Sequence, residues 1–132
     1  MLTIQEIHTA LERVSHRSAE FTPDHRHCAV AMILVPGERE LEACFIRRAE
    51  RAGDPWSGQV AFPGGRAEPG DASAPAVAER ETFEEVGLRL NAEQRIGALP
   101  THAIRSNMTL SPFIYYLPSR GKGPRPQQIA SP

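Results

Sequence analysis

The stretch GGRAEPGDASAPAVAERETFEEVGL, residues 64–88, decides how the rest of the chain is interpreted. Its two adjacent glycines permit positive φ angles and a close approach of the backbone to a ligand. After a polar loop, residues 74–86 have the composition of a helix, with a proline in the first turn and Gly87 as a C-terminal cap. Either Asp71 or Ser73 is suited to cap its N-terminus. The stretch is therefore predicted as a glycine turn, a loop and one helix.

The end of this helix carries three carboxylates on one face. Glu81, Glu84 and Glu85 have i, i+3 and i, i+4 spacing, so their side chains project together. Clustered carboxylates repel one another, and Mg²⁺ would offset that repulsion because it prefers carboxylate oxygens and often bridges to phosphates. The alternative is a solvated acidic face without a ligand. The glycine turn before the helix favours a cation, since a phosphate chain would then lie between the turn and the metal.

Outward from this stretch, apolar spacing predicts one more helix and several strands. Residues 2–14 have helical spacing, with Thr3 as the N-cap. Strands are predicted over residues 28–36, 42–48, 59–62, 94–99 and 109–117. The first two are expected to pair through the turn between them, and the polar segment between the last two is predicted as a loop. This order indicates an α/β domain with a mixed sheet.

The length and composition limit the possible classes of protein. The chain has 132 residues, which fits one domain, predicted over residues 1–118. Residues 119–132, rich in Pro, Gly, Lys and Gln, are predicted to be a disordered tail. Lys plus Arg is 15 and Asp plus Glu is 16, a balance that supports neither nucleic-acid nor membrane-surface binding but allows a small phosphorylated ligand.

Location and redox state are predicted only by default. The N-terminus lacks a basic region followed by an apolar stretch, and no apolar run approaches the roughly 20 residues of a membrane span. A cytoplasmic location is therefore expected. Cys28 and Cys44 lie in apolar runs and are predicted to be buried free thiols, with a disulfide or metal pair as the alternative.

The glycine-to-glutamate stretch resembles the Nudix box, the signature of the Nudix hydrolases. That signature reads Gly, five residues, Glu, seven residues, Arg-Glu, apolar, any residue, Glu-Glu, any residue, Gly, apolar. This chain supplies Gly65, then Asp71 after five residues, then RETFEEVGL from Arg80. It departs from the signature in three respects: Asp71 replaces Glu, eight residues precede Arg80, and Thr82 takes a usually apolar position. The resemblance implies a Nudix fold, a mixed sheet between helices (α/β/α), here with a short C-terminal part.

The first two departures occur together in the coenzyme A pyrophosphatase-like branch of the family, which the chain resembles in particular. Residues 58–65, GQVAFPGG, resemble the upstream motif of that branch. Residues 47–51 match the motif only in part, and its usual downstream basic residue falls near Gly53 and Asp54. The whole resemblance covers roughly residues 28–118.

The resemblance also implies roles for individual residues. Glu81, Glu84 and Glu85 would ligate Mg²⁺ or Mn²⁺, and Glu84 or Glu85 would polarise the attacking water. Arg80 would form an ion pair within the box and orient a glutamate. The alternative for Arg80 is an ordinary surface arginine. Backbone at Gly64 would bind substrate phosphates, or would form an ordinary turn.

Other assignments rest on residue type and leave alternatives open. Gly65 would present backbone to the phosphates as its neighbour does, or form an ordinary turn. Arg47 and Arg48 would contact substrate phosphates, or remain solvated beside their strand. Trp56 would stack on a base or pack over the sheet edge. Asp71 would contribute at the edge of the box or cap the helix.

Two expectations concern the other side of the box helix. Ala76, Phe83 and Val86 would pack on the sheet. Glu79 falls beside them, where a buried charge needs a partner, either Arg80 or an arginine upstream.

The predicted reaction is metal-assisted hydrolysis of a pyrophosphate bond in a small, dinucleotide-like molecule linked through a nucleoside diphosphate. The branch implies coenzyme A or acyl-coenzyme A, cleaved to 3′,5′-ADP and (acyl-)4′-phosphopantetheine. ADP-ribose, another nucleotide sugar or another nucleotide is the alternative substrate. A regulatory or inactive ligand-binding domain is the alternative of another class, and a homodimer partner would be one way to complete the short C-terminal part.

Overall fold

The computed structural model describes residues 3–13, 21–48, 52, 60–104, 107–118 and 130–131, with the backbone alone at 47–48 and 130–131. The helices and strands follow in the order α1 (Ile4–Glu12), β1 (His27–Pro36), β2 (Leu41–Ala43), β3 (Ile46–Arg48), β4 (Val60–Ala61), β5 (Gly64–Arg66), α2 (Ala74–Val86), β6 (Arg95–Ala98), β7 (His102–Ile104), β8 (Met108–Tyr116) and β9 (Ala130–Ser131). Both predicted helices and the core of each predicted strand are present.

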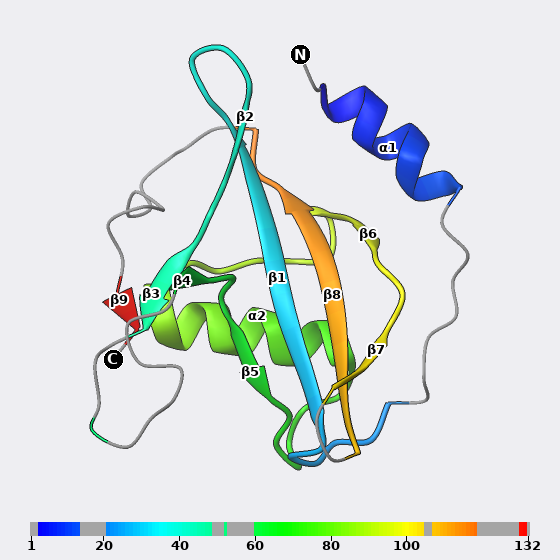
Figure 1. The fold of residues 1–132 in the computed structure, drawn as a ribbon, viewed down its shortest axis with the longest axis vertical. Coiled ribbons are helices and arrows are strands. Elements are labelled where there is room, and N and C mark those ends of the chain that lie inside the picture. Colours follow the sequence, from blue (N-terminus) through cyan, green and yellow to red (C-terminus); the bar gives the residue numbers. More distant parts are fainter. Residues whose placement is uncertain are drawn as a thin grey trace.

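A six-stranded mixed sheet forms the centre of the molecule (Figure 1). Its strand order is β2-β1-β8-β6, while β5 also pairs with β1 and β7 with β8. The long strands β1 and β8 run parallel, with Ala29 opposite Ser111 and Ile33 opposite Tyr115. The other pairs in this sheet are antiparallel. The prediction of an α/β fold with a mixed sheet is therefore confirmed.

The predicted strand 42–48 is in fact two strands in two sheets. β2 pairs with β1, and the Cys44 N–H still donates to the Ile33 carbonyl at 2.8 Å. The chain then turns away, and β3 joins a second sheet of order β4-β3-β9. Phe45 stacks on Phe62 with ring centroids 4.7 Å apart, which ties β3 to the segment after β4. A continuous apolar pattern does not reveal this change of sheet.

Two strands and part of the tail also differ from prediction. β5 lies where a glycine turn was expected, and β7 lies where a polar loop was expected. β7 pairs antiparallel with β8, although its three residues are all exposed. Within the predicted disordered tail, residues 130–131 form β9, which pairs parallel with β3. Residues 119–129 of that tail lie outside the described part of the chain.

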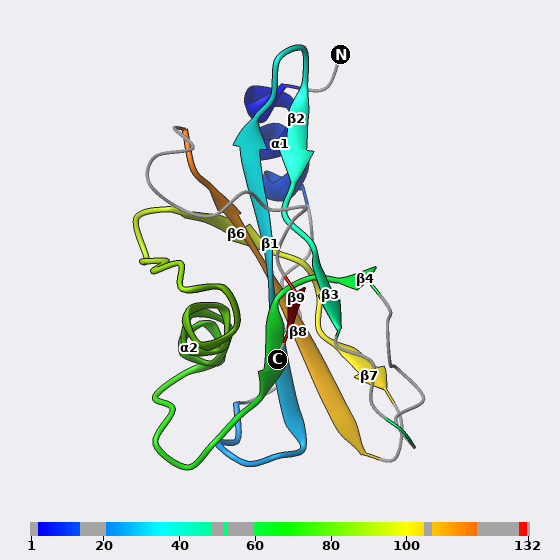
Figure 2. The same cartoon turned by 90° about the vertical axis from the view of Figure 1, so that its left-hand side faces the viewer.

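The hydrophobic core lies between β1, β8 and α2 (Figure 2). Ala29 and Ala31 of β1 are fully buried, and their small side chains let the helix approach the sheet closely. From α2, Val77 and Ala78 are fully buried against this face. The Thr82 side chain is also fully buried, and its hydroxyl donates to the Ala78 carbonyl at 2.7 Å. A polar residue at this usually apolar position therefore keeps its hydrogen bond.

The expected packing of Phe83 on the sheet is wrong. Its side chain is 41% exposed, and the Arg89 guanidinium lies 4.1 Å from the ring centroid. Val86 is buried as expected, whereas Ala76 is only partly buried. The face of α2 that packs on the sheet is therefore formed by Val77, Ala78 and Thr82, and not by Ala76 and Phe83 as predicted. Small side chains fit the narrow space between α2 and β1.

Helix α1 lies near the end of the sheet that is farther from α2 (Figure 2). The Thr3 side chain accepts a hydrogen bond from the Glu6 N–H, which confirms the predicted cap. Leu11 is buried, and a Cβ at Gly97 of β6 would lie 2.8 Å from its Cδ1. Neither helix in the described part of the chain is long and apolar enough to cross a membrane. Cys28 and Cys44 are buried free thiols, as predicted.

Glu79 finds its partners on the sheet. The Tyr115 hydroxyl donates to Glu79 Oε2 at 2.7 Å, and Arg95 Nη1 lies 3.6 Å from the same oxygen. The predicted partners, Arg80 or an upstream arginine, are therefore replaced by residues from β8 and β6. Burial, followed by the neighbouring Glu79, raises the pKa of Tyr115 well above its usual value. This contact fixes α2 to the sheet across the core.

We expect Tyr115→Phe to lower the free energy of unfolding by about 1.5–3 kcal/mol, because a partly buried hydrogen bond to a charged group is lost. Urea unfolding followed by circular dichroism measures the change. Tyr116→Phe is the matched control and should lose less. Equal losses in both variants would contradict the importance of the Glu79 contact.

Candidate functional site

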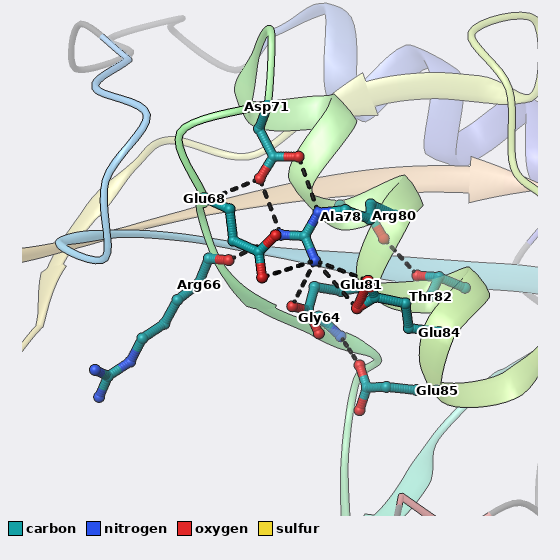
Figure 3. A network of polar contacts seen from close by, with 10 residues as sticks. All are labelled: Gly64, Arg66, Glu68, Asp71, Ala78, Arg80, Glu81, Thr82, Glu84 and Glu85. Carbon is teal, nitrogen blue, oxygen red and sulfur yellow. Dashed lines mark hydrogen bonds and ion pairs between the residues drawn. The ribbon is translucent and has the colours of Figure 1, made fainter.

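Strand β5 lies directly beneath the acidic face of α2. A Cβ on Gly65 would stand 2.5 Å from Glu81 Cδ, so the Glu81 carboxylate rests against bare backbone. The Gly64 N–H donates to Glu85 Oε1 at 2.8 Å (Figure 3). A Cβ on Gly64 would meet the Ala29 carbonyl at 2.3 Å, so only glycine allows β5 to pair this closely with β1. The site depends on two positions without side chains.

The Arg80 guanidinium lies at the centre of the site (Figure 3). Its Nε and Nη2 donate to the two oxygens of Asp71, each at 2.9 Å. Nη2 also donates to the Arg66 carbonyl at 3.0 Å. Nη1 donates to Glu81 Oε1 at 3.0 Å and to Glu84 Oε2 at 3.1 Å. All five N–H donors that an arginine offers are thus directed at oxygen atoms.

Asp71 anchors this arginine and does not cap the helix. The N-cap is Ser73, whose side chain accepts from the Ala76 N–H at 3.2 Å. The Asp71 side chain is 6% exposed, and besides Arg80 it accepts a hydrogen bond from the Glu68 N–H at 2.8 Å. Hydrogen bonding from Arg80 holds the pKa of Asp71 below its usual value. The interpretation of Asp71 as the helix cap is therefore wrong. Asp71 instead forms an ion pair with Arg80 at the edge of the box.

The carboxylates of the site differ in their surroundings. Burial raises the pKa of Glu81, and the hydrogen bond from Arg80 offsets part of that rise. The Glu81 side chain is 20% exposed, whereas that of Glu84 is 53% exposed. The pKa of Arg80 itself is raised, chiefly by its hydrogen bond to Asp71. Arg80 therefore stays charged and balances part of the negative charge on α2.

The donor set fits a hard divalent cation. Carboxylate oxygens are the ligands such ions prefer, and Glu81 and Glu84 already converge on one cationic group within 3.1 Å. Glu85 follows on the next position of the helix and reaches Gly64. Within the described residues, no three His, Cys, Asp or Glu side chains stand grouped for a metal ion. Arg80 Nη1 lies between the carboxylates of Glu81 and Glu84.

The structure thus brings six of the predicted site residues together: Gly64, Gly65, Arg80, Glu81, Glu84 and Glu85. Arg47 and Arg48 lie on β3, but their side chains are outside the described part of the structure, as are all of Trp56, Gly53 and Asp54. Two contributors were not predicted. One is the Arg66 carbonyl, a backbone group that no residue type signals. The other is Glu68, whose Oε1 lies 3.8 Å from Arg80 Nη1.

Residues 25–128 match the model of the NUDIX domain. The chain is 42% identical over 82 residues to an uncharacterised protein of Schizosaccharomyces pombe, covering 56% of this chain and 25% of that protein. It is 30% identical over 117 residues to NudL, an uncharacterised Nudix hydrolase of Escherichia coli K12, covering 89% of this chain and 60% of NudL.

A solved structure shows the same fold at low sequence identity. A MutT/nudix family protein from Enterococcus faecalis superposes with a TM-score of 0.58 and 19% identity, over 88% of this chain and 44% of that one. The chain belongs to the Nudix family.

Family membership confirms the predicted Nudix fold. Nudix hydrolases generally use divalent metal ions and act on nucleoside diphosphate derivatives. The chain spans 60% of the length of NudL.

We expect Asp71→Asn to lower the free energy of unfolding by about 2 kcal/mol at pH 7, because a buried, bidentate, charged hydrogen bond is lost. The folded-state pKa of Asp71 is depressed, so its contribution is present above the unfolded-state pKa of about 3.9 and is lost as the pH falls through the folded value. Urea unfolding at pH 7 and near pH 3 should show a difference from wild type that shrinks in acid.

Asp24→Asn provides the control, since Asp24 pairs with Arg26, whose side chain is 61% exposed. The control should be less destabilised than Asp71→Asn. A loss for Asp71→Asn that is the same at both pH values would refute the assigned ion pair.

Proposed function

We propose that this chain is the catalytic domain of a Mg²⁺- or Mn²⁺-dependent Nudix pyrophosphohydrolase, with the domain over residues 1–118. One observation carries the proposal: Glu81, Glu84 and Glu85 lie on one face of α2 above the bare backbone of β5. A pyrophosphate ester is anionic and resists attack by water. A bound divalent cation supplies charge neutralisation, a more acidic water and stabilisation of the leaving phosphate.

The side chains of the chain itself would bind and orient the reactants. Glu81, half-buried against Gly65, would be a fixed metal ligand, and Glu84 and Glu85 would complete the set. Glu84 is open to solvent, which suits a carboxylate that polarises water; Glu85, bonded to the Gly64 N–H, is the other candidate. Arg80 holds Glu81 by one oxygen and so orients it.

The phosphate chain of the substrate would lie along β5. Gly64 and Gly65 leave the backbone there without Cβ atoms, so a phosphate can approach closely. Arg47 and Arg48, on the adjoining small sheet, would contact further phosphates through their planar donors. We propose coenzyme A or acyl-coenzyme A as substrate, on the resemblance of residues 58–65 to the motif of that branch. ADP-ribose or another nucleotide sugar is the second candidate, since the family acts on nucleoside diphosphate derivatives.

A substrate panel tests the proposal. Coenzyme A, acetyl-coenzyme A, ADP-ribose and a nucleotide sugar are incubated with the protein and Mg²⁺ or Mn²⁺, and the products are separated by chromatography. We expect 3′,5′-ADP and 4′-phosphopantetheine from coenzyme A. Glu84→Gln should lower kcat at least about 100-fold, because a metal ligand and water-orienting group is lost.

Glu40→Gln, in the exposed turn between β1 and β2, is the matched control and should retain wild-type kcat. Cleavage of ADP-ribose alone would replace the coenzyme A assignment. No hydrolysis of any member of the panel, by protein that is folded and binds Mn²⁺, would favour a regulatory ligand-binding domain.

Two alanine variants separate the roles of the glycines. Gly65→Ala places a Cβ against the movable end of Glu81, so it should fold but bind Mn²⁺ and turn over substrate about 10-fold less well. Gly64→Ala places a Cβ against the backbone of Ala29, so it should lose about 1–3 kcal/mol of stability. Calorimetric Mn²⁺ titration and urea unfolding measure both. The assignment is wrong if Gly65→Ala binds Mn²⁺ as wild type does.

A further inference from the structure

The two ends of the Arg80 guanidinium have different environments. Nε and Nη2 form a bidentate pair with Asp71, whose side chain is 6% exposed, and Nη2 also reaches the Arg66 carbonyl. Nη1 points the other way, into the acidic face of α2, and is shared between Glu81 and Glu84. Nε and Nη2 are thus anchored by a buried carboxylate and a backbone carbonyl. Nη1 is held by carboxylate side chains, those of Glu81 and Glu84 and, at 3.8 Å, that of Glu68.

The two carboxylates on Nη1 are held differently. Glu81 presents only Oε1 to Arg80, at 3.0 Å, while its Oε2 lies 2.7 Å from the position that a Cβ on Gly65 would take. Glu84 presents both oxygens to the same Nη1, at 3.3 and 3.1 Å. The Glu84 side chain is 53% exposed, so water screens its i, i+4 ion pair with Arg80. The space around it allows this side chain to change rotamer. Glu84 is therefore the carboxylate that Arg80 can release while keeping its other bonds.

We propose that Arg80 holds Glu84 in the metal-free protein and gives it up to a divalent cation, while Nε and Nη2 stay on Asp71 and the Arg66 carbonyl. This inference rests on the proposed function, which assigns Glu81 and Glu84 as metal ligands. Arg80 acts here as a resident counter-ion: it limits repulsion on α2 before a cation arrives, and then competes with that cation for Glu84. A purely orienting arginine would instead strengthen cation binding.

The competing and orienting roles predict opposite changes in affinity. Arg80→Gln removes a positive charge adjacent to the cation position, so we expect the Mn²⁺ dissociation constant to fall about tenfold. The same variant should unfold at a lower temperature in EDTA, because both Asp71 and the acidic face have lost their counter-ion. Arg95→Gln is the matched control, since Arg95 pairs with Glu79 on the same helix but outside the site. Its Mn²⁺ affinity should equal that of wild type.

A measurement on the wild-type protein does not depend on the folding of a variant. Nuclear magnetic resonance of the arginine side chains reports rotation about the Cζ–Nη1 bond of Arg80 and protection of its Nε–H. On addition of Mg²⁺ to protein in EDTA, we expect rotation at Nη1 to speed up several-fold while the Nε–H stays protected by Asp71.

The outcomes separate this inference from the proposed function. Weaker Mn²⁺ binding by Arg80→Gln, unchanged Nη1 rotation, or failure of the wild-type protein to bind Mn²⁺ at millimolar concentration would overturn the counter-ion role. Hydrolysis of the panel with unchanged Nη1 rotation overturns the counter-ion role alone. The expected binding and rotation changes without hydrolysis support the counter-ion role and refute the enzymatic proposal.

Discussion

Strand β5 can lie between β1 and α2 only because two successive residues have no side chain. At Gly64 a Cβ would collide with the backbone of β1, and at Gly65 it would collide with Glu81 of α2. This close approach brings a row of backbone groups under the acidic face of the helix. It also gives Glu85 an N–H donor from the strand. Packing and chemistry meet on one short strand: a side chain at Gly64 would disturb the pairing with β1, and one at Gly65 would disturb Glu81.

The remaining problem of the site is electrostatic. Three glutamates on two turns of one helix repel each other, and in water the repulsion costs a few tenths of a kcal/mol for each pair. Arg80 relieves it by directing Nη1 at two of them, and it holds that position because Asp71 fixes the opposite edge of the guanidinium. The loop between β5 and α2 is therefore part of the site, since it carries the anchor.

Local patterns were enough to predict α2 correctly over residues 74–86, with the glycine after it. They failed where distant contacts decide. Residues 42–48 read as one strand because their apolar pattern is continuous, yet the chain changes sheet after Cys44. β5 was missed because glycine is rare in strands, and only its fit against β1 explains it. Asp71 was predicted as a possible cap because aspartate commonly caps helices, but its side chain pairs with Arg80, nine residues later.

By itself, the sequence determined that three glutamates share one face of the helix that follows a glycine pair, since i, i+3 and i, i+4 neighbours lie side by side on a helix. It also determined α2 and its Gly87 cap, where the backbone is left-handed (φ 72°). Only the tertiary structure decided which oxygens Arg80 reaches, that Tyr115 pairs with Glu79, and that β3 leaves the main sheet. Those outcomes depend on distances between segments remote in the chain, and no local spacing encodes them.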